Sequence, residues 1–491
     1  PPVKIAFDQN GKPTKAALKF ADSNNVAMDA LERLVTDKGD YLVYRGLEKG
    51  QASTTLLPGF VNSALADLPI PRRMRWGSSD VEFVRPVHWV VMLQGSEVVA
   101  ATVLGLRADR LSFGHRFHAP AAISLASAAD YATTLQQQGH VVAGFLDRKA
   151  LILEAANAAA TSHGGHVVIP DALLDEVTAL VEWPTAVVGS FAESFLELPA
   201  EVLISTLQEH QRYFPVYRQD GALTNRFITM SNIASVDPEQ VRLGNEKVVK
   251  PRLADAAFFW TQDLKTSLES KAPNLEQVVY QKGLGSLADK AQRVAALAAD
   301  IAAQLGASPA AAERAAHLAK ADLLTEMVGE FPDLQGLMGS YYASHDGETP
   351  EIAAAIREQY LPRFAGDVLP STSIGQALSI ADKLDTLAGI FALGQRPSGS
   401  KDPFGLRRLA LGMLRIIIES QIDLDVPRQI ANALELQPLN AAPEAKAELY
   451  EFIVDRLKSY YLDGQNPALS SSSVSAEQFE AVRQREPVSP V

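Results

Sequence analysis

The hydrophobic pattern changes along the chain from strand-like to helical. Residues 81–94 are rich in Val, Phe, Trp and Leu, and Gly95-Ser96 separates them from a second apolar run over 97–104. Two such runs around a two-residue turn predict a β-hairpin, and Pro86 predicts an edge strand or a bulge. Similar patterns predict strands at 41–44, 167–169 and 185–188, a hairpin of 213–218 with 227–232, and helices at 14–20, 127–138, 145–161 and 198–210.

Helical signals dominate from residue 286 onward. Ser286 with Asp289 is typical of a capping box, and Ser308-Pro309 places Pro at the first helical position after an N-cap residue. The predicted helices cover 287–305, 309–330, 350–360, 373–393 and 404–421, followed by a helical stretch over 427–491 that contains 444–461 and a serine-rich loop at 470–475.

The length of the chain predicts several domains. A chain of 491 residues is too long for one hydrophobic core. The changes in pattern divide it into a mixed segment (1–71), an α+β segment (72–283) and two helical segments (284–425 and 426–491). We therefore expect a multidomain α+β fold. Because the chain opens with Pro1 and ends in what reads as the middle of a domain, we also expect truncation at both ends.

Residues 319–336 combine acidic and small apolar residues in a pattern typical of a helix end. Asp322, Glu326 and Glu330 repeat at i, i+4 and i+8, so one helix would align three carboxylates, and Pro332 would end it. Like charges at this spacing repel, so the stripe needs cations. A metal-dependent hydrolase centre would supply them, and the alternative is a packed helix with a salt-bridged or solvated edge.

A metal-dependent phosphohydrolase of the HD type needs an adjacent His-Asp pair and a later Asp. Here Ala321 precedes Asp322, and Asp382 is the candidate for the later Asp. Two carboxylates without imidazoles make a poor transition-metal site, so we predict no bound metal; magnesium held through water and phosphate is the alternative. His115 and His118 could form a metal pair, but a structural hairpin end explains them better.

No catalytic residue is predicted. The chain has no P-loop, no dinucleotide fingerprint and no G-x-S-x-G motif. We expect Asp322, Glu326 and Asp382 to be structural and to pair with Lys or Arg, with Lys320 and Lys383 as the nearest candidates.

Composition limits the compartment and the partners. The absence of Cys excludes disulfides and fits a reducing, cytoplasmic compartment. We find no run that approaches a membrane span and no opening signal peptide, so no membrane partner is expected. The net charge of −13 argues against a nucleic-acid partner unless basic groups gather locally.

Four basic clusters could hold phosphate, although each is also explained as a solvated face. They are Arg72, Arg73 and Arg75; Arg107, Arg110, His115 and Arg116; Lys247, Lys250 and Arg252; and Lys401, Arg407 and Arg408. The last cluster is predicted to open a helix near Pro403-Phe404, whose free amides would favour an anion. Alternatively, Lys401 and Arg407 would neutralise Asp382 and Asp385.

Several motifs together resemble the beta subunit of the bacterial heterotetrameric glycyl-tRNA synthetase. They are 74–77 (MRWG), 83–89 (FVRPVHW), 114–117 (GHRF), 210–214 (HQRYF), 244–248 (GNEKV), 252–260 (RLADAAFFW), 284–293, 319–336 and 401–408 (KDPFGLRR). The resemblance implies that 72–283 is similar to the B3/B4 domain of the phenylalanyl-tRNA synthetase beta subunit. It implies an HD-like helical domain at 284–425 without ligand His residues, in which Asp322 and Asp382 are remnants of a metal centre. The segment 426–491 would begin an incomplete helical anticodon-binding domain.

The resemblance implies a tRNA-binding, non-catalytic subunit of glycine–tRNA ligase. Within an α2β2 complex, the alpha subunit would bind glycine, ATP and Mg²⁺ and make the adenylate. This chain would bind tRNA(Gly) through the basic clusters, support the alpha dimer and hold no cofactor. The alternative is an HD-type metal-dependent phosphohydrolase that acts on nucleotides, and a bound transition metal would distinguish it.

Overall fold

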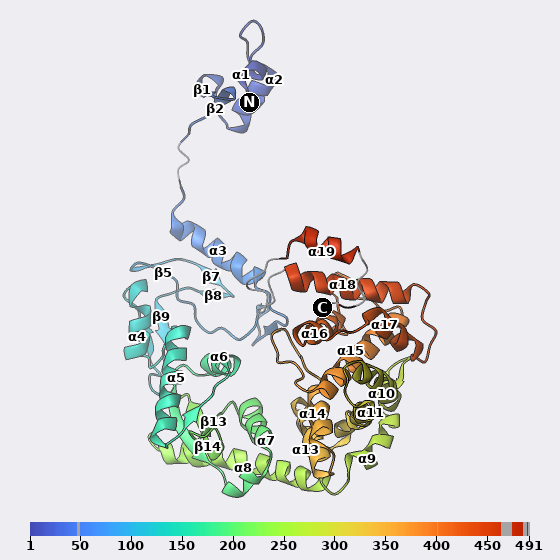
Figure 1. Cartoon of the computed structure of the whole chain (residues 1–491). Helices are drawn as coiled ribbons and strands as arrows, with labels where there is room; N and C mark the ends of the chain where they lie inside the picture. The colour runs from blue at the N-terminus through green and yellow to red at the C-terminus, as the bar shows by residue number, and fades with distance from the viewer. Residues whose placement is uncertain (47–49, 400, 463–473, 485–488, 490–491) are drawn as a thin grey trace. The chain divides into compact units, whose positions relative to one another are not determined.

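The computed structural model describes residues 1–46, 50–399, 401–462, 474–484 and 489, and packing divides the chain into two compact units. The first unit is Pro1–Gly144 and the second is Phe145–Val491. This division does not identify domains, so the four segments stay a prediction. Most of the expected serine-rich loop, residues 470–473, lies outside the described residues. Small sheets in the first unit and a mostly helical later part confirm the mixed α+β class (Figure 1).

The first unit is built from short helices and two-stranded sheets. A small core of Val3, Ala6, Ala17 and Leu42 packs its first residues together. The elements are α1 (Val3–Ala6), α2 (Lys15–Ser23), η1 (Met28–Ala30), β1 (Glu32–Thr36), β2 (Gly39–Val43), α3 (Ser53–Asp67), β3 (Met74–Arg75), β4 (Glu82–Phe83), β5 (Leu93–Gln94), β6 (Glu97–Val98), β7 (Thr102–Val103), β8 (Leu106–Arg107), β9 (Leu111–Phe113), β10 (Ala122–Ser124), η2 (Ala128–Asp130) and α4 (Tyr131–Gln137).

The hairpin predicted around Gly95-Ser96 is confirmed, but its strands are much shorter than expected. Leu93 pairs with Val98, and Gln94 pairs with Glu97. The long first strand predicted over 81–94 is wrong. β4 ends at Phe83, and a bend at 84–85 followed by irregular chain around Pro86 separates it from β5. Proline lacks an amide hydrogen, so it interrupts a ladder rather than prolonging it.

The second unit opens with an antiparallel sheet of order β11-β13-β14-β12. Its strands are β11 (His166–Val167), β12 (Thr185–Ser190), β13 (Phe214–Tyr217) and β14 (Leu223–Ser231), and the predicted hairpin is confirmed as β13–β14. Helices α5 (Phe145–Ser162) and α6 (Asp171–Leu180) contribute Ile152 and Leu174 to a core with Phe214 and Ile228. The helix predicted over 198–210 is α7 (Ala200–Ser205) continued by a π-helical turn, η4 (Thr206–His210).

A long helix that the sequence pattern did not predict, α8 (Pro238–Asp263), connects the sheet to the helical part. Asp237 caps its start by accepting from the amide of Gln240, and Pro238 occupies the first turn. At its far end Asp263 accepts from the amides of Glu326 and Met327 and from the hydroxyl of Tyr342. One buried carboxylate of α8 thus caps a helix of the following part.

The helical part is packed around α15 (Ser373–Ala392), most of whose residues are buried. This helix packs against six others, which gather beside it in Figure 1: α10 (Leu287–Gln304), α11 (Pro309–Leu318), α14 (Pro350–Glu358), α16 (Leu406–Glu419), α17 (Val426–Glu435) and α18 (Ala445–Leu462). The remaining elements are η3 (Glu193–Glu197), α9 (Leu268–Lys271), η5 (Ala272–Gln277), β15 (Val279–Gln281), β16 (Gly285–Ser286), η6 (Ala321–Leu324), α12 (Glu326–Glu330), η7 (Pro332–Leu334), α13 (Leu337–His345) and α19 (Ala476–Arg483). The capping box of Ser286 and Asp289 is present as predicted.

The single helix predicted over 309–330 is wrong. α11 ends at Leu318, and Thr325 adopts an extended conformation that starts the short helix α12. The Thr325 hydroxyl accepts from the amide of Val328 and donates to the carbonyl of Asp322, so the break is hydrogen-bonded. Because of this break, buried Asp322 does not share a stripe with the exposed Glu326 and Glu330. The predicted stop before Pro332 is confirmed, since α12 ends at Glu330.

No helix among the described residues is long and apolar enough to span a bilayer.

Gly336 provides a test of this packing. Its φ is +79°, and a Cβ at this position would lie 2.7 Å from the ring of Tyr360. Gly347 has a similar φ of +88° with open space around it. We expect Gly347→Ala to lower the free energy of unfolding by about 1 kcal/mol through backbone strain alone. Gly336→Ala should cost about 1–3 kcal/mol more because of the clash. Urea unfolding of the two variants measures the difference, and equal losses would contradict it.

Candidate functional site

A cluster of buried charges lies where α10, α11 and α15 meet. The ammonium groups of Lys290 and Lys320 each lie 3.3 Å from the same oxygen of Asp382. Burial alone would raise the pKa of Asp382, but the charges of these two lysines and of Lys383 outweigh burial and hold the pKa below its usual range. The expected pairing of Asp382 with Lys320 is therefore confirmed, and Lys290 is a second partner.

Asp385, one turn further along α15, has its own set of partners. Its side chain is fully buried and accepts from Arg293 Nε at 2.6 Å, Lys290 Nζ at 3.1 Å and Gln437 Nε2 at 3.0 Å. Arg293 also donates to the carbonyl of Leu284 at 3.1 Å. Asp385 thus joins Lys290 and Arg293 in one buried, hydrogen-bonded ion-pair network.

Asp322 is held by backbone amides rather than by a close cation. One oxygen accepts from the amides of Gly336 at 2.5 Å and Gly339 at 3.1 Å. Burial raises the pKa of Asp322 to about 6, although the two amides and the charge of Lys320 oppose this shift. Asp322 and Glu326 form no ion pair within 4.0 Å among the described side chains, so their expected pairing with Lys or Arg is not found.

Lys383, the second lysine expected to pair with these acids, forms no ion pair with a carboxylate among the described residues. Its ammonium donates to the carbonyl of Leu361 at 2.7 Å, to Ser379 Oγ at 2.6 Å and to the carbonyl of Gln359 at 3.5 Å. Burial lowers the pKa of Lys383 to about 7, against the opposing charge of Asp382. Consecutive residues on a helix point to different sides, so Lys383 cannot reach the partners of its neighbour.

The geometry of this charge cluster suits packing better than metal-assisted hydrolysis. Two ammonium groups lie against Asp382, at the place where a hydrolase of this type would use a cation. His317 lies outside the cluster, about half exposed, with its ring 3.8 Å from Glu313. Across the part of the chain that the structure describes, no group of three or more His, Asp or Glu is arranged to hold a metal ion.

The two basic clusters of the first unit differ in how free their side chains are. Arg72, Arg73 and Arg75 are exposed, with Arg75 near Asp80 and Glu82 and Arg73 donating to the carbonyl of Ala66 at 2.8 Å. In the second cluster Arg107 and Arg116 are exposed. Arg110 instead donates to the carbonyls of Ser96 and Leu125, both at 2.9 Å, and His115 is 2% exposed. The last two side chains therefore serve the local fold.

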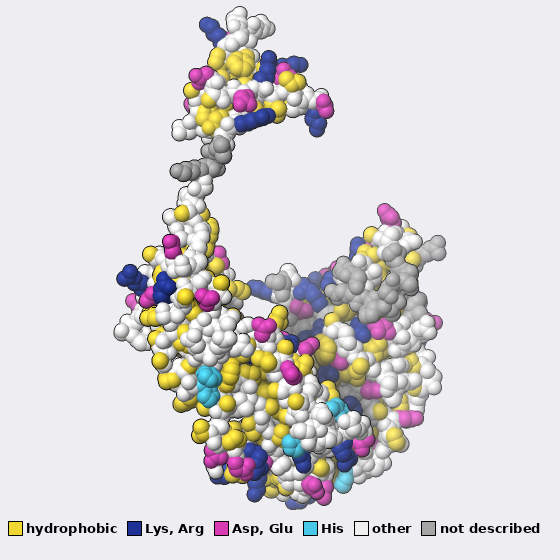
Figure 2. All heavy atoms as spheres, turned by 90° about the vertical axis from the view of Figure 1, so that its left-hand side faces the viewer, with side chains coloured by type: hydrophobic (Ala, Val, Ile, Leu, Met, Phe, Trp, Pro, Cys, Tyr) yellow, Lys and Arg dark blue, Asp and Glu magenta, His cyan; other side chains and the backbone are white. Residues whose placement is uncertain are grey.

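Lys247, Lys250 and Arg252 lie exposed on α8. Lys247 and Lys250 are three residues apart and share a face of the helix, while Arg252 pairs with Glu330 at 3.0 Å. On the face of the molecule in Figure 2, Lys and Arg side chains lie interspersed with Asp and Glu rather than in one basic field. On the face in Figure 2, any phosphate contact would therefore involve a few neighbouring Lys or Arg side chains rather than a broad basic surface.

The cluster at α16 corrects one expectation about the helix start. The helix begins at Leu406, not near Pro403, and Asp402 accepts from the amides of Leu406 and Arg407, both at 2.9 Å. The amides expected to favour an anion are thus already bound. Arg407 donates to the carbonyl of Gly399 at 2.7 Å, so it supports the loop.

The alternative expectation for this cluster is wrong, because neither Lys401 nor Arg407 neutralises Asp382 or Asp385; Lys290, Lys320 and Arg293 do so. Lys401 and Arg408 remain exposed.

Sequence reasoning missed the roles of Lys290 and Arg293 in this cluster. Both lie on α10, and they are buried on an otherwise apolar face. The available signal was the pair Asp382 and Asp385, which interrupts a hydrophobic helix and so predicts buried cationic partners.

The raised pKa of Asp322 predicts a pH-dependent contribution to stability. A carboxyl whose folded pKa is above its unfolded value stabilises the fold below the unfolded pKa, and this contribution is lost as pH rises through about 6. Asp322→Asn cannot ionise. Between about pH 4 and pH 8 the variant should therefore gain up to about 3 kcal/mol relative to the wild type. Urea unfolding across this range measures the change, with the exposed Asp255→Asn as control. A constant difference would contradict the prediction.

Comparison with known proteins gives one consistent result. The sequence matches the glycyl-tRNA synthetase beta subunit family over residues 1–476. It is 49% identical over 491 residues to the glycine–tRNA ligase beta subunit of Hahella chejuensis, covering 100% of this chain and 70% of that protein. It is 51% identical over 484 residues to that of Chromohalobacter salexigens, covering 99% of this chain and 69% of that protein. The chain belongs to the glycyl-tRNA synthetase beta subunit family and is part of glycine–tRNA ligase.

Proposed function

We propose that this chain is a tRNA-binding, non-catalytic subunit of glycine–tRNA ligase. In this proposal it works with an alpha subunit in an α2β2 complex, and that subunit binds glycine, ATP and Mg²⁺. The observation that carries the proposal is the family match together with the charge cluster at Asp382. Asp382, the later Asp that a hydrolase would use, is engaged there by Lys290 and Lys320.

The exposed basic side chains support the RNA part of the proposal. Lys247 and Lys250 on α8 and Lys401 and Arg408 at α16 are exposed, and no ion pair within 4.0 Å is found for them among the described residues. Arg and Lys at such positions supply the sequence-independent part of RNA affinity, even on a chain with net charge −13. Arg110, His115 and Arg407 are less suited to contact RNA because they serve the local fold.

The HD-type phosphohydrolase has less support as a second candidate. Such an enzyme would need a cation bound at Asp322 and Asp382. Asp382 already lies against two lysines, and Asp322 accepts backbone amides. A divalent ion would have to displace both ammonium groups from a buried site, which is unfavourable unless other ligands replace them.

Because the proposal places glycine and ATP binding on the alpha subunit, it predicts that this chain alone makes no glycyl-adenylate. Glycine-dependent exchange between ATP and pyrophosphate should be absent for the isolated chain and should appear when the alpha subunit is added. The same preparation should be tested for retention of the alpha subunit in a pull-down, which separates lack of activity from lack of assembly. Exchange by the chain free of alpha subunit would refute the proposal.

Lys401 and Arg408 provide the test of RNA contact. Lys401→Ala with Arg408→Ala should weaken tRNA binding and reduce the slope of log affinity against log salt by about one per lost phosphate contact. Lys265→Ala with Lys446→Ala removes the same charge from other exposed positions and serves as the matched control. Gel-shift titrations at several salt concentrations give both quantities. A folded double variant with an unchanged slope would show that this cluster does not touch tRNA.

A further inference from the structure

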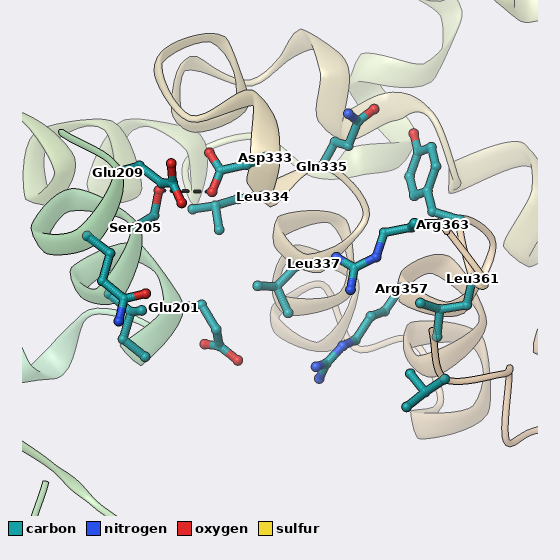
Figure 3. Close-up of a pocket in the computed structure, with 14 residues that line it drawn as sticks. Glu201, Ser205, Glu209, Asp333, Leu334, Gln335, Leu337, Arg357, Leu361 and Arg363 are labelled. Atoms are coloured by element: carbon teal, nitrogen blue, oxygen red, sulfur yellow. Dashed lines mark hydrogen bonds between the residues drawn. The ribbon is translucent and has the colours of Figure 1, made fainter. Parts of the chain in front are cut away.

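A pocket of about 400 Å³ lies within the second unit, between the turn after α7 and the helices α13 and α14. Figure 3 shows acidic and polar side chains projecting from one wall and two arginines from the other. Glu201, Ser205 and Glu209 belong to the first wall, and Arg357 and Arg363 to the second. No function described above uses this pocket.

Hydrogen bonds connect the walls of the pocket. Ser205 Oγ donates to Asp333 at 2.9 Å, and the hydroxyl of Tyr341 donates to Glu201 at 2.8 Å. The first wall includes a π-helical turn, η4, a conformation that is rare and concentrated at functional sites. Hydrogen bonds therefore hold the two walls of the cavity together.

The two arginines differ in how they are held. Arg363 is fixed by Asp367, with Nε at 3.0 Å and Nη2 at 3.4 Å from its two oxygens. Arg357, in the last turn of α14, is exposed and has no ion pair within 4.0 Å among the described residues. One guanidinium is thus pre-positioned and the other is available for a ligand.

The floor of the pocket rests on the buried charge cluster. Tyr360 lines the pocket, and its ring covers the ammonium of Lys320 at 4.1 Å. Gly336, between the lining residues Gln335 and Leu337, donates its amide to Asp322 and packs against Tyr360. The buried charge cluster therefore supports the pocket from beneath.

We propose that this pocket binds a single phosphorylated nucleoside, either as a free mononucleotide or as the 5′-phosphorylated end of an RNA. Arg357 offers the forked pair of donors that suits a phosphate dianion, and Arg363, whose Nε and Nη2 already donate to Asp367, adds a second positive charge beside it. Glu201 and Glu209 on the opposite wall accept from hydroxyl or amino groups of the nucleoside. Leu334, Leu337 and Tyr360 supply apolar surface for the base, and the volume lies within the range of small-ligand sites.

The proposal is tested on the chain as it exists, by calorimetric titration with AMP, adenosine and inorganic phosphate. AMP should bind more tightly than adenosine. Arg357→Ala should weaken AMP binding by about ten- to a hundred-fold, the effect of one lost charge-assisted contact. Val368→Trp, which fills the exposed rim of the pocket, should have a similar effect. Lys446→Ala, which removes an exposed charge elsewhere in the unit, should leave binding unchanged.

A second set of titrations distinguishes a free mononucleotide from the 5′-phosphorylated end of an RNA as the ligand. A five-nucleotide RNA is titrated with and without a 5′-phosphate. If the phosphorylated RNA binds more tightly than AMP, and Arg357→Ala abolishes the difference between the two RNAs, the ligand is an RNA end. If AMP binds as tightly as that RNA, it is a free nucleotide. The proposal is overturned if neither binds, if adenosine binds as well as AMP, or if Arg357→Ala binds AMP like the wild type. None of these results bears on the proposed tRNA contact at α16, which is tested separately by the salt dependence of tRNA binding in the Lys401 and Arg408 variants.

Discussion

The packing of the second unit depends on the neutralisation of two buried carboxylates, those of Asp382 and Asp385. Asp382 and Asp385 lie one turn apart on α15, a largely apolar helix that packs against six others. A carboxylate in such a place is stable only with close cations or donors, and removing one partner of a buried pair costs about 3–5 kcal/mol. Lys290 and Arg293 on α10 and Lys320 after α11 meet this need. The ion pairs therefore fix how three helices pack.

The local chemistry of helix ends was predictable from sequence, because each signal involves residues a few positions apart. Ser286 with Asp289 and Ser308 with Pro309 act at their helix starts as predicted. The break at Thr325 was not predictable in this way. Residues 309–330 are compatible with one helix by periodicity, and the break depends on Asp263 of a distant helix, which caps α12. Tertiary contacts decide such positions.

The candidate site shows the same limit. The expected pairing of Asp382 with Lys320 is confirmed, and its structural role stays a prediction. Lys383 points elsewhere, because adjacent residues on a helix project in different directions. Arg357 and Arg363 could not be recognised as pocket residues from the sequence. They face Glu201 and Glu209, which lie far away in the chain, and only the packing of α14 beside the turn after α7 brings these side chains together.

The two contacts between α8 and α12 have a mechanical consequence. Asp263 caps α12 through two amides, and Arg252 pairs with Glu330 at 3.0 Å near its other end. Both ends of the short helix are thus attached to one long rod, and the chain leaving α12 leads through η7 directly into the pocket wall at Asp333 and Leu334. α8 carries Lys247 and Lys250 on its exposed face. A displacement of α8 would therefore move α12 and, through η7, the wall of the pocket.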